Sequence, residues 1–311
     1  MQNVIVIVGP TASGKTSLSI DLAKHYNGEI ISADSMQIYK YMDIGTAKPT
    51  IEEMEGIKHY LIDEVNPDED FNVVKYTQLA NQYIEEIFSK GKQPIIVGGT
   101  GLYVSSLVNN ITFSESECDP ELRNKLQQEA DEYGAQYLHD KLSNVDPEAA
   151  DSIHPNNIKR VIRALEIFYQ TQKPKAFHNE QSKQTPPKYN YILLGLNMER
   201  ELLYSRINKR VDIMLEAGLL EEVKHIIKLG YGDCNIAMQG IGYKQIISYL
   251  NGDISFEEAI ELIKRDSRRY AKRQLTWFRR MNEINWLNVD NIGNNDNVVS
   301  SAIAIIDGLL R

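Results

Sequence analysis

The sequence predicts an α/β fold in which a parallel sheet has helices on both faces and is interrupted by an all-helical insertion. Short apolar segments alternate with helix-compatible segments over the N-terminal third, and this alternation is typical of βαβ units. A long middle stretch then contains helical patterns only, before one buried strand pattern returns. The insertion is therefore expected between two strands of the same sheet.

The elements of the expected core follow from short apolar runs and from 3.6-residue periodicity. Strands are expected at residues 4–8, 29–33, 94–97 and 191–196. Helices are expected at residues 16–25, 72–89, 200–229 and 256–281, followed by a weakly patterned tail. Ligands in such sheets bind at the carboxyl ends of the strands, so the loops after the strands are the places to look for a site.

The pattern changes near Phe113, where the expected insertion begins. Short helices are expected at residues 120–133, 135–141, 147–152 and 156–169. A polar stretch at residues 170–188, with prolines and lysines, is typical of a mobile loop. We therefore expect one domain from residues 1–112 and 191–311, and a helical domain from residues 113–190.

Composition and charge restrict the class of protein. The chain has 311 residues, of which 42% are hydrophobic and 25% charged, as in ordinary globular proteins. A net charge of −9 argues against nonspecific coating of nucleic acid but is compatible with a local basic groove. Cys118 and Cys234 belong to no C-x-x-C pair, so we expect two reduced thiols and no zinc site. The first apolar run is expected to be a core strand, no stretch is long enough to span a membrane, and a cytoplasmic protein is expected.

A phosphate-binding loop follows the first expected strand. Residues 9–16 read Gly-Pro-Thr-Ala-Ser-Gly-Lys-Thr and match G-x-x-x-x-G-K-[ST] at every fixed position. Such a loop points backbone N–H groups and the start of the next helix at phosphate oxygens. Lys15 is expected to reach the terminal phosphate and the Thr16 hydroxyl to bind Mg²⁺. A Gly-rich turn without chemistry is the alternative, but the strand–loop–helix context favours a P-loop NTPase-like core. The expected phosphate site consists of Gly9, Pro10, Thr11, Ala12, Ser13, Gly14, Lys15 and Thr16.

Asp34 follows the second expected strand, at the same sheet edge as the phosphate loop and the glycine-rich turn at residues 98–101. Three roles are compatible with this position: an outer-sphere magnesium ligand, a helix N-cap and a general base. The residues alone do not choose among them.

Basic residues are concentrated in the last long helix. Most such basic runs are simply solvated helix faces. In an acidic protein, however, a concentrated basic run is also what a surface that binds a phosphodiester backbone would show. The residues are Lys264, Arg265, Arg268, Arg269, Lys272, Arg273, Arg279 and Arg280. A second set, Lys159, Arg160 and Arg163, shares one turn of the insertion, and Arg206 with Arg210 is spaced to clamp one phosphate group. His154 and His178 receive no role.

Several blocks of the sequence resemble the bacterial tRNA dimethylallyltransferases. They include the phosphate loop, Asp-Ser-Met-Gln-Ile-Tyr at 34–39, Met-Asp-Ile-Gly-Thr-Ala-Lys-Pro at 42–49 and Val-Gly-Gly-Thr-Gly-Leu-Tyr at 97–103. His-Pro-Asn at 154–156, Arg160 with Arg-Ala-Leu-Glu at 163–166, Gly-Ile-Gly-Tyr-Lys-Gln at 240–245 and Lys-Arg-Gln-Leu-Thr-Trp-Phe-Arg at 272–279 complete the resemblance. It extends from the first strand to about Trp286. The phosphate loop alone is shared by many nucleotide enzymes, whereas its combination with the 34–39 block and the Gly-Gly-Thr turn is specific.

The resemblance implies a prenyl transfer. Members of that family move the dimethylallyl group of dimethylallyl diphosphate to N6 of the adenosine 3′-adjacent to the anticodon, in tRNAs that read U-initial codons. Diphosphate is released and N6-(dimethylallyl)adenosine is formed. The phosphate loop, with Mg²⁺, would hold the leaving diphosphate, and Asp34 would take the proton from the adenine amino group. The catalytic residues implied in this way are Asp34, Thr100, Arg206 and Arg210.

The resemblance also implies that the helical insertion binds the tRNA anticodon stem-loop. The tRNA-binding residues implied are Asp34, Ser35, Met36, Gln37, Thr100, Arg123, Lys159, Arg160, Val161, Ile162, Arg163, Gln239, Gly240 and Tyr243. Position 239 carries Gln where some relatives carry Arg. Eukaryotic relatives carry a C-terminal zinc finger, and this sequence offers no Cys or His ligands for such a module. Nothing in the sequence demands more than a monomer.

Two other functions are compatible with the phosphate loop. An adenylate prenyltransferase or a nucleotide kinase would use the same loop but would not need a basic helical insertion. A non-catalytic or ATP-driven RNA-binding protein would keep its function without Asp34.

Overall fold

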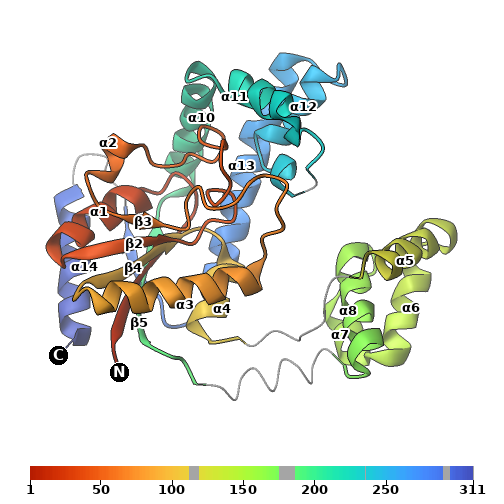
Figure 1. The fold of residues 1–311 in the computed structure, drawn as a ribbon, viewed down its shortest axis with the longest axis horizontal. Coiled ribbons are helices and arrows are strands. Elements are labelled where there is room, and N and C mark those ends of the chain that lie inside the picture. Colours follow the sequence, from red (N-terminus) through yellow and green to blue (C-terminus); the bar gives the residue numbers. More distant parts are fainter. Residues whose placement is uncertain (112–118, 175–185, 235, 290–294, 311) are drawn as a thin grey trace. The chain divides into compact units, whose positions relative to one another are not determined.

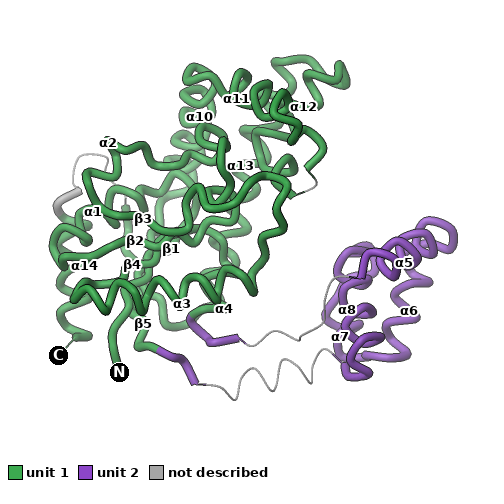
Figure 2. The backbone as a smooth tube through the Cα atoms, viewed as in Figure 1, with its two compact units in different colours: residues 1–107, 189–311 green, residues 108–188 purple. Residues whose placement is uncertain are grey.

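The computed structural model describes residues 1–111, 119–174, 186–234, 236–289 and 295–310. They form two compact units (Figure 2), one from residues 1–107 and 189–311 and the other from residues 108–188. The helical domain expected at residues 113–190 thus corresponds to a unit that begins and ends slightly earlier. Phe113, Cys118, His178 and most of the expected loop at residues 170–188 lie outside the described residues.

A six-stranded parallel sheet forms the centre of the first unit, in the order β3-β2-β4-β1-β5-β6 (Figure 1). The strands are β1 (Asn3–Val8), β2 (Gly28–Ser32), β3 (His59–Tyr60), β4 (Gln93–Gly98), β5 (Asn190–Asn197) and β6 (Asn285–Asn288). The four strands expected from the sequence are present, with ends shifted by a residue or so. The sequence analysis missed β3 because two residues carry no periodicity, and β6 because it has only two apolar residues, between two Asn.

The central strands are buried, as in parallel sheets covered on both faces. Ile5 of β1 is in register with Ile95 of β4 and Ile192 of β5, and all three belong to the main hydrophobic cluster. The chain crosses the sheet in one direction from β1 to β2 and in the other from β3 to β4. Because such crossovers are right-handed, α1 (Lys15–His25) and α3 (Val73–Ser89) lie on opposite faces.

The remaining helices of the first unit include two corrections to the sequence analysis. They are α2 (Ile51–Met54), α4 (Gly101–Val108), α10 (Arg200–Glu216), α11 (Leu219–Ile226), α12 (Tyr243–Leu250), α13 (Phe256–Phe278) and α14 (Asn295–Leu310). The prediction of one helical segment at residues 200–229 was wrong, because the structure has two helices there, α10 and α11. The chain breaks at Gly218, whose φ of 100° is left-handed, and α11 runs into a π-helical turn (Ile227–Tyr231). The weakly patterned tail contains α14, which returns to α1 and buries Ala302 and Ile306.

The second unit is a bundle of α5 (Pro120–Tyr133), α6 (Ala135–Val145), α7 (Pro147–Ser152) and α8 (Ile158–Thr171). Asp119 and Asp146 cap α5 and α7 through their side chains, and a proline follows each cap at the first helical position. Buried leucines, valine and isoleucine from these helices form a separate hydrophobic cluster. The unit therefore has its own core, as an inserted domain requires.

Four segments lie at the carboxyl ends of the strands. The phosphate loop follows β1, Asp34 follows β2, the glycine-rich turn at residues 98–101 follows β4, and Asn197 ends β5. No helix within the described ranges combines the length and apolar character that a membrane span requires.

Candidate active site

The phosphate loop has the backbone of a phosphate nest. Ala12 (φ 63°) and Gly14 (φ 94°) adopt left-handed conformations, which turn successive N–H groups toward the inside of the loop. At Gly9 a Cβ atom would lie 3.0 Å from the carbonyl oxygen of Leu196 on β5, so only glycine fits without displacing that strand. The loop is thus curled tightly between β1 and β5, with α1 beginning at Lys15.

Gln274 of α13 holds the phosphate loop against the turn after β4. Its Oε1 accepts a hydrogen bond from the Thr11 N–H at 2.9 Å, and its Nε2 donates to the Gly99 carbonyl oxygen at 3.0 Å. The side chain is buried, and a Cβ on Gly99 would lie 2.1 Å from Nε2. Sequence reasoning did not identify Gln274 as a site residue, because nothing in the helical pattern of 256–281 distinguishes it.

Lys15 and Arg210 bring positive charge to the loop. Burial, with a smaller contribution from the Arg210 guanidinium, lowers the pKa of the Lys15 amine to about 8, while Asp34 partly opposes this. The Lys15 Nζ donates to the Pro10 carbonyl oxygen at 2.7 Å. The two guanidinium nitrogens of Arg210 lie 3.4 Å from the Thr11 hydroxyl and 3.4 Å from the Ala47 carbonyl oxygen. Two cations beside a nest of N–H groups form a site suited to a diphosphate.

Asp34 and Thr100 are held next to each other by the backbone between β2 and β4. The Asp34 Oδ1 accepts the Met36 N–H at 2.9 Å, and the Thr100 Oγ accepts the Ser35 N–H at 3.0 Å. A Cβ on Gly98 would lie 2.2 Å from the Ala33 carbonyl oxygen, so the two strand ends touch. No α-helix begins at Asp34, and its carboxylate closes a turn instead. Of the three roles compatible with the sequence, that of a helix N-cap is therefore excluded.

A cavity of about 320 Å³ opens between these groups and helices α10, α12 and α13. Its polar part includes Thr11, Asp34 and Arg210, and Ile207, Val211, Met214 and Ile263 give it apolar walls. The cavity also brings together the expected residues Ser35, Met36, Gln239, Gly240 and Tyr243.

Tyr270 of α13 lines the same cavity and lies close to Thr100 and to the Asp34 carboxylate. Burial and, to a smaller extent, the nearby Asp34 carboxylate raise the pKa of the Tyr270 phenol to about 12, although Thr100, Arg273 and Gln274 partly oppose the shift, so the phenol stays protonated. The phenol is therefore a neutral donor close to the carboxylate.

Two expected site residues lie elsewhere. The Gln37 amide is turned into its own segment, where it accepts from the Ser32 hydroxyl at 3.0 Å and donates to the Ala47 carbonyl oxygen at 3.2 Å. Arg206 lies one turn before Arg210 but does not line the cavity, and no bond joins it to the described part of the chain. The expected Arg206–Arg210 clamp is therefore not formed in this structure.

Glu222 of α11 anchors one wall of the cavity. Its carboxylate accepts the N–H groups of Asp43, Ile44 and Gly45 at 2.9, 2.7 and 3.0 Å, and the Tyr243 hydroxyl at 2.6 Å. A Cβ on Gly45 would lie 2.5 Å from the Tyr243 ring. Burial and the Glu222 carboxylate raise the pKa of Tyr243, so its hydroxyl keeps the donated proton. Sequence reasoning missed Glu222, since its partners are far away along the chain.

Comparison with known proteins supports one family for this arrangement. Residues 37–281 match the model of the family described as IPP transferase. The chain belongs to the IPP transferase family. A tRNA dimethylallyltransferase of Acetivibrio thermocellus is 60% identical over 301 residues, which cover 97% of this chain and 96% of the relative.

Solved structures of the IPP transferase family agree with the fold. The tRNA isopentenylpyrophosphate transferase of Bacillus halodurans has a TM-score of 0.74 and 46% identity, over 99% of this chain and 96% of that one. A eukaryotic dimethylallyltransferase acting on tRNA has a TM-score of 0.85 and 33% identity, over 100% of this chain and 80% of that one.

The donors available for a magnesium ion are few. Among the described residues there is no group of three His, Cys, Asp or Glu side chains that could hold a metal ion. The Thr16 hydroxyl lies on the exposed first turn of α1. This arrangement fits Mg²⁺, which is commonly held by one or two protein oxygens together with substrate phosphates and water.

Within the helical unit of this IPP transferase, two of the expected tRNA-binding arginines hold a buried carboxylate. Burial alone would raise the pKa of Glu166, but hydrogen bonds from Arg123, the Asp119 N–H and Arg163 bring it below the usual value. Arg123 donates Nε and Nη2 to the two carboxylate oxygens at 2.8 and 2.9 Å. Arg123 and Arg163 are therefore part of the internal structure of the unit.

The other expected tRNA-binding residues of the helical unit are two buried apolar side chains and two exposed cations. Val161 and Ile162 are buried in the core of the helical unit, so their side chains do not face a ligand. Lys159 and Arg160 are exposed, and neither has an ion pair within the described chain. Of the described residues at 159–163 that were expected to contact tRNA, Lys159 and Arg160 are therefore the two that present a free cation.

The basic residues of the last long helix, α13, differ in whether acidic side chains lie next to them. The first half of α13 is partly neutralised: Lys264 pairs with Asp212 at 2.7 Å, and Arg265 and Arg269 share Asp266 at 3.1 and 3.7 Å. Arg268 donates to the Asn208 side chain at 2.6 Å. Lys272, Arg273, Arg279 and Arg280 have no ion pair within the described residues, so free positive charge is concentrated at the end of α13.

Proposed function

We propose that this protein transfers the dimethylallyl group of dimethylallyl diphosphate to N6 of the adenosine 3′-adjacent to the anticodon in tRNAs that read U-initial codons. The observation that carries this proposal is one cavity lined by Thr11 of the phosphate loop, by the Arg210 cation and by the Asp34 carboxylate, in a chain of the IPP transferase family. The relatives named tRNA dimethylallyltransferase support the reaction, and the eukaryotic structure acting on tRNA supports the acceptor.

The phosphate loop is suited to stabilise a leaving group. As the bond between C1 and its oxygen breaks, negative charge develops on the diphosphate. Lys15, Arg210 and the loop N–H groups are placed to neutralise that charge without rearrangement. We propose that Thr16 is the protein ligand of one Mg²⁺, which would add further charge neutralisation when bound.

Asp34 is suited to take the proton of the attacking amine. The Met36 N–H engages its Oδ1, which fixes the carboxylate and leaves the other oxygen to accept a proton. The N6–C1 bond forms, the C1–O bond breaks, the N6 proton moves to Asp34, and diphosphate departs. The apolar walls formed by Ile207, Val211 and Met214 suit the dimethylallyl group and exclude water from it.

The target adenine must leave its stack to reach the cavity, which costs about a few kcal/mol and least in a loop. We propose that the helical unit supports this step by contacting the anticodon stem-loop through Lys159 and Arg160. Since tRNA is the acceptor, we propose that the enzyme acts in the cytoplasm. The residues that line the cavity come from one chain, and we propose that a monomer suffices.

A labelled-donor assay tests the proposal. Dimethylallyl diphosphate labelled in its prenyl group is incubated with the protein and either unmodified tRNA or AMP. We expect label in tRNA only, and transfer to AMP alone would overturn the proposal. Asp34→Ala should abolish transfer while tRNA binding is kept, whereas Asp253→Ala, which removes an exposed carboxylate outside the cavity, should behave as wild type.

A further inference from the structure

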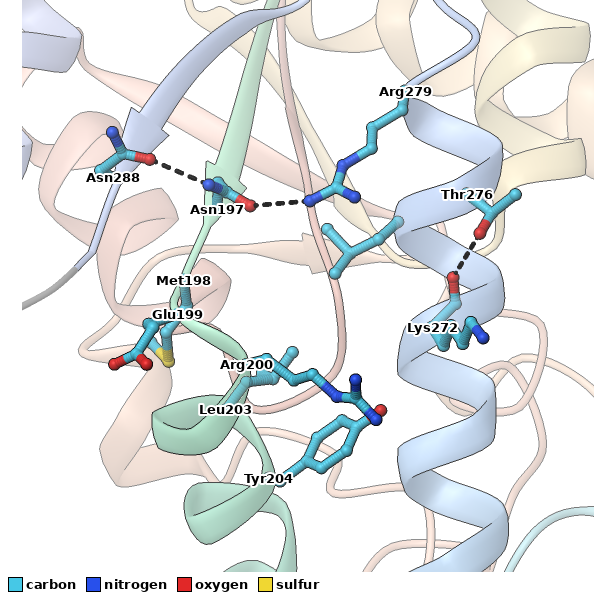
Figure 3. A pocket seen from close by; sticks show the side chains of 11 residues that line it. Asn197, Met198, Glu199, Arg200, Leu203, Tyr204, Lys272, Thr276, Arg279 and Asn288 are labelled. Carbon is cyan, nitrogen blue, oxygen red and sulfur yellow. Dashed lines mark hydrogen bonds between the residues drawn. The ribbon is translucent and has the colours of Figure 1, made fainter.

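A second cavity, of about 470 Å³, lies beyond the carboxyl ends of β5 and β6 (Figure 3). Its walls come from the segment after β5, the first turn of α10 and the last turns of α13. The lining residues are Asn197, Met198, Glu199, Arg200, Leu203, Tyr204, Lys272, Leu275, Thr276, Arg279 and Asn288. None of them lines the cavity that contains Asp34, so the two are separate sites.

Three cations in this second cavity are not neutralised by the protein. Arg200, Lys272 and Arg279 have no ion pair within the described residues. In the described part of the chain, the Arg279 guanidinium donates to the Asn197 side-chain oxygen alone, at 3.4 Å. The nearest acidic lining residue is Glu199, whose carboxylate points away from the three cations (Figure 3). Three uncompensated cations around one cavity attract an anion.

The floor of the second cavity is apolar and partly aromatic. Met198 and Leu203 are buried, and Leu275 packs against the same hydrophobic cluster. The Arg200 guanidinium lies over the Tyr204 ring, 5.1 Å from its centroid. An arginine plane stacked on a tyrosine, next to further cations, is a surface on which a base can stack while its phosphate is held.

The position of the cavity is that of a ligand site in a parallel sheet. Ligands of such sheets bind outside the carboxyl ends of the strands, and β5 is the immediate neighbour of the strand that leads into the phosphate loop. A volume of this size accommodates a mononucleotide. The proposed prenyl transfer does not use this cavity, because the donor diphosphate has its own loop.

We propose that the second cavity binds a nucleotide, with the phosphate held by Arg200, Lys272 and Arg279 and the base against Tyr204. This goes beyond the proposed transfer reaction. The shared chemistry is a phosphate next to a planar base, and it can come from a free nucleotide or from one nucleotide of an RNA chain.

Equilibrium binding of labelled AMP tests the proposal in the Lys15→Ala chain, in which the phosphate loop is weakened. Adding Arg200→Gln or Arg279→Gln should weaken AMP binding at least about tenfold, because each removes a charged donor to the phosphate. Arg265→Gln is the control, since it removes an exposed arginine of α13 that does not line the cavity. Both cavity arginines are exposed, and unchanged thermal melting confirms that the variants fold.

A second arm identifies the source of the nucleotide. A labelled anticodon stem-loop RNA is titrated against the same variants at several salt concentrations. A weaker RNA affinity and a smaller salt slope in Arg200→Gln assign the cavity to RNA, and an effect on AMP alone assigns it to a free nucleotide. Affinities for AMP and RNA that are both unchanged in Arg200→Gln and Arg279→Gln would overturn the proposal. Because prenyl transfer is not the readout, this result is independent of the proposed function.

Discussion

Replacing Glu222 with Gln should loosen the wall of the first cavity. The carboxylate accepts four hydrogen bonds, two at each oxygen. A Gln amide has one oxygen, so its NH₂ group faces either the Asp43 and Ile44 N–H groups, which can only donate, or the Gly45 N–H and the Tyr243 hydroxyl, of which only the hydroxyl can turn to accept. One or two hydrogen bonds to a charged acceptor are lost, according to the orientation of the amide, and each is worth about 1.5–3 kcal/mol when buried. Because the site is partly exposed, we expect a loss of about 2–4 kcal/mol in the free energy of unfolding.

Urea unfolding and steady-state kinetics together measure this effect. We also expect KM to rise, since the segment held by Glu222 leads to Ala47, whose carbonyl oxygen accepts from Arg210. Glu221→Gln is the control, because that neighbouring side chain is 72% exposed and, among the residues that the structure describes, pairs with Lys224 alone. It should change the free energy of unfolding by less than about 0.5 kcal/mol. A Glu222→Gln protein with control-like stability and an unchanged KM would refute the anchoring role.

Three further predictions concern the diphosphate and tRNA sites. Lys15 has a pKa lowered to about 8, so its charged fraction, and with it the diphosphate affinity, should fall as pH rises through about 8. Calorimetry in buffers of different ionisation enthalpy should show proton uptake there, and an affinity that does not change with pH would contradict this. Gln274→Leu leaves the Thr11 N–H and the Gly99 carbonyl without partners and should cost about 2–4 kcal/mol of unfolding free energy in urea. A stability within error of wild type would contradict the bridge. Arg160→Ala should lower tRNA affinity and reduce its salt slope by about one in filter-binding assays, with diphosphate binding unchanged, and an unaltered slope would exclude the contact.

The features that the sequence predicts well are local ones. The phosphate loop could be recognised because its strand, its glycines and its helix lie within some twenty consecutive residues, and the structure shows the expected strand–loop–helix. The four longer strands could be predicted because each is a continuous apolar run. Asp34 could be placed beside the loop, because both follow strands of one parallel sheet.

The features that the sequence did not predict depend on contacts between distant segments. Gln274 and Glu222 are polar residues in helical patterns, and only the packing of α13 and α11 gives them partners 263 and about 177 positions away. The charge of α13 could be counted from the sequence, but its neutralisation by Asp212 on α10 could not. Arg206 was expected beside Arg210 because of spacing, whereas helix orientation turns only Arg210 to the cavity.

The central claim is that the phosphate loop holds a leaving diphosphate, so that a carbon–oxygen bond breaks. The most direct measurement uses dimethylallyl diphosphate with a heavy-oxygen label at the atom that joins C1 to phosphorus. After reaction with unmodified tRNA, mass analysis should find dimethylallyl on N6 of adenosine and the label in the released diphosphate. A label that stays with the dimethylallyl product, or phosphate transferred to the tRNA, would mean that a phosphorus–oxygen bond breaks and would contradict the account.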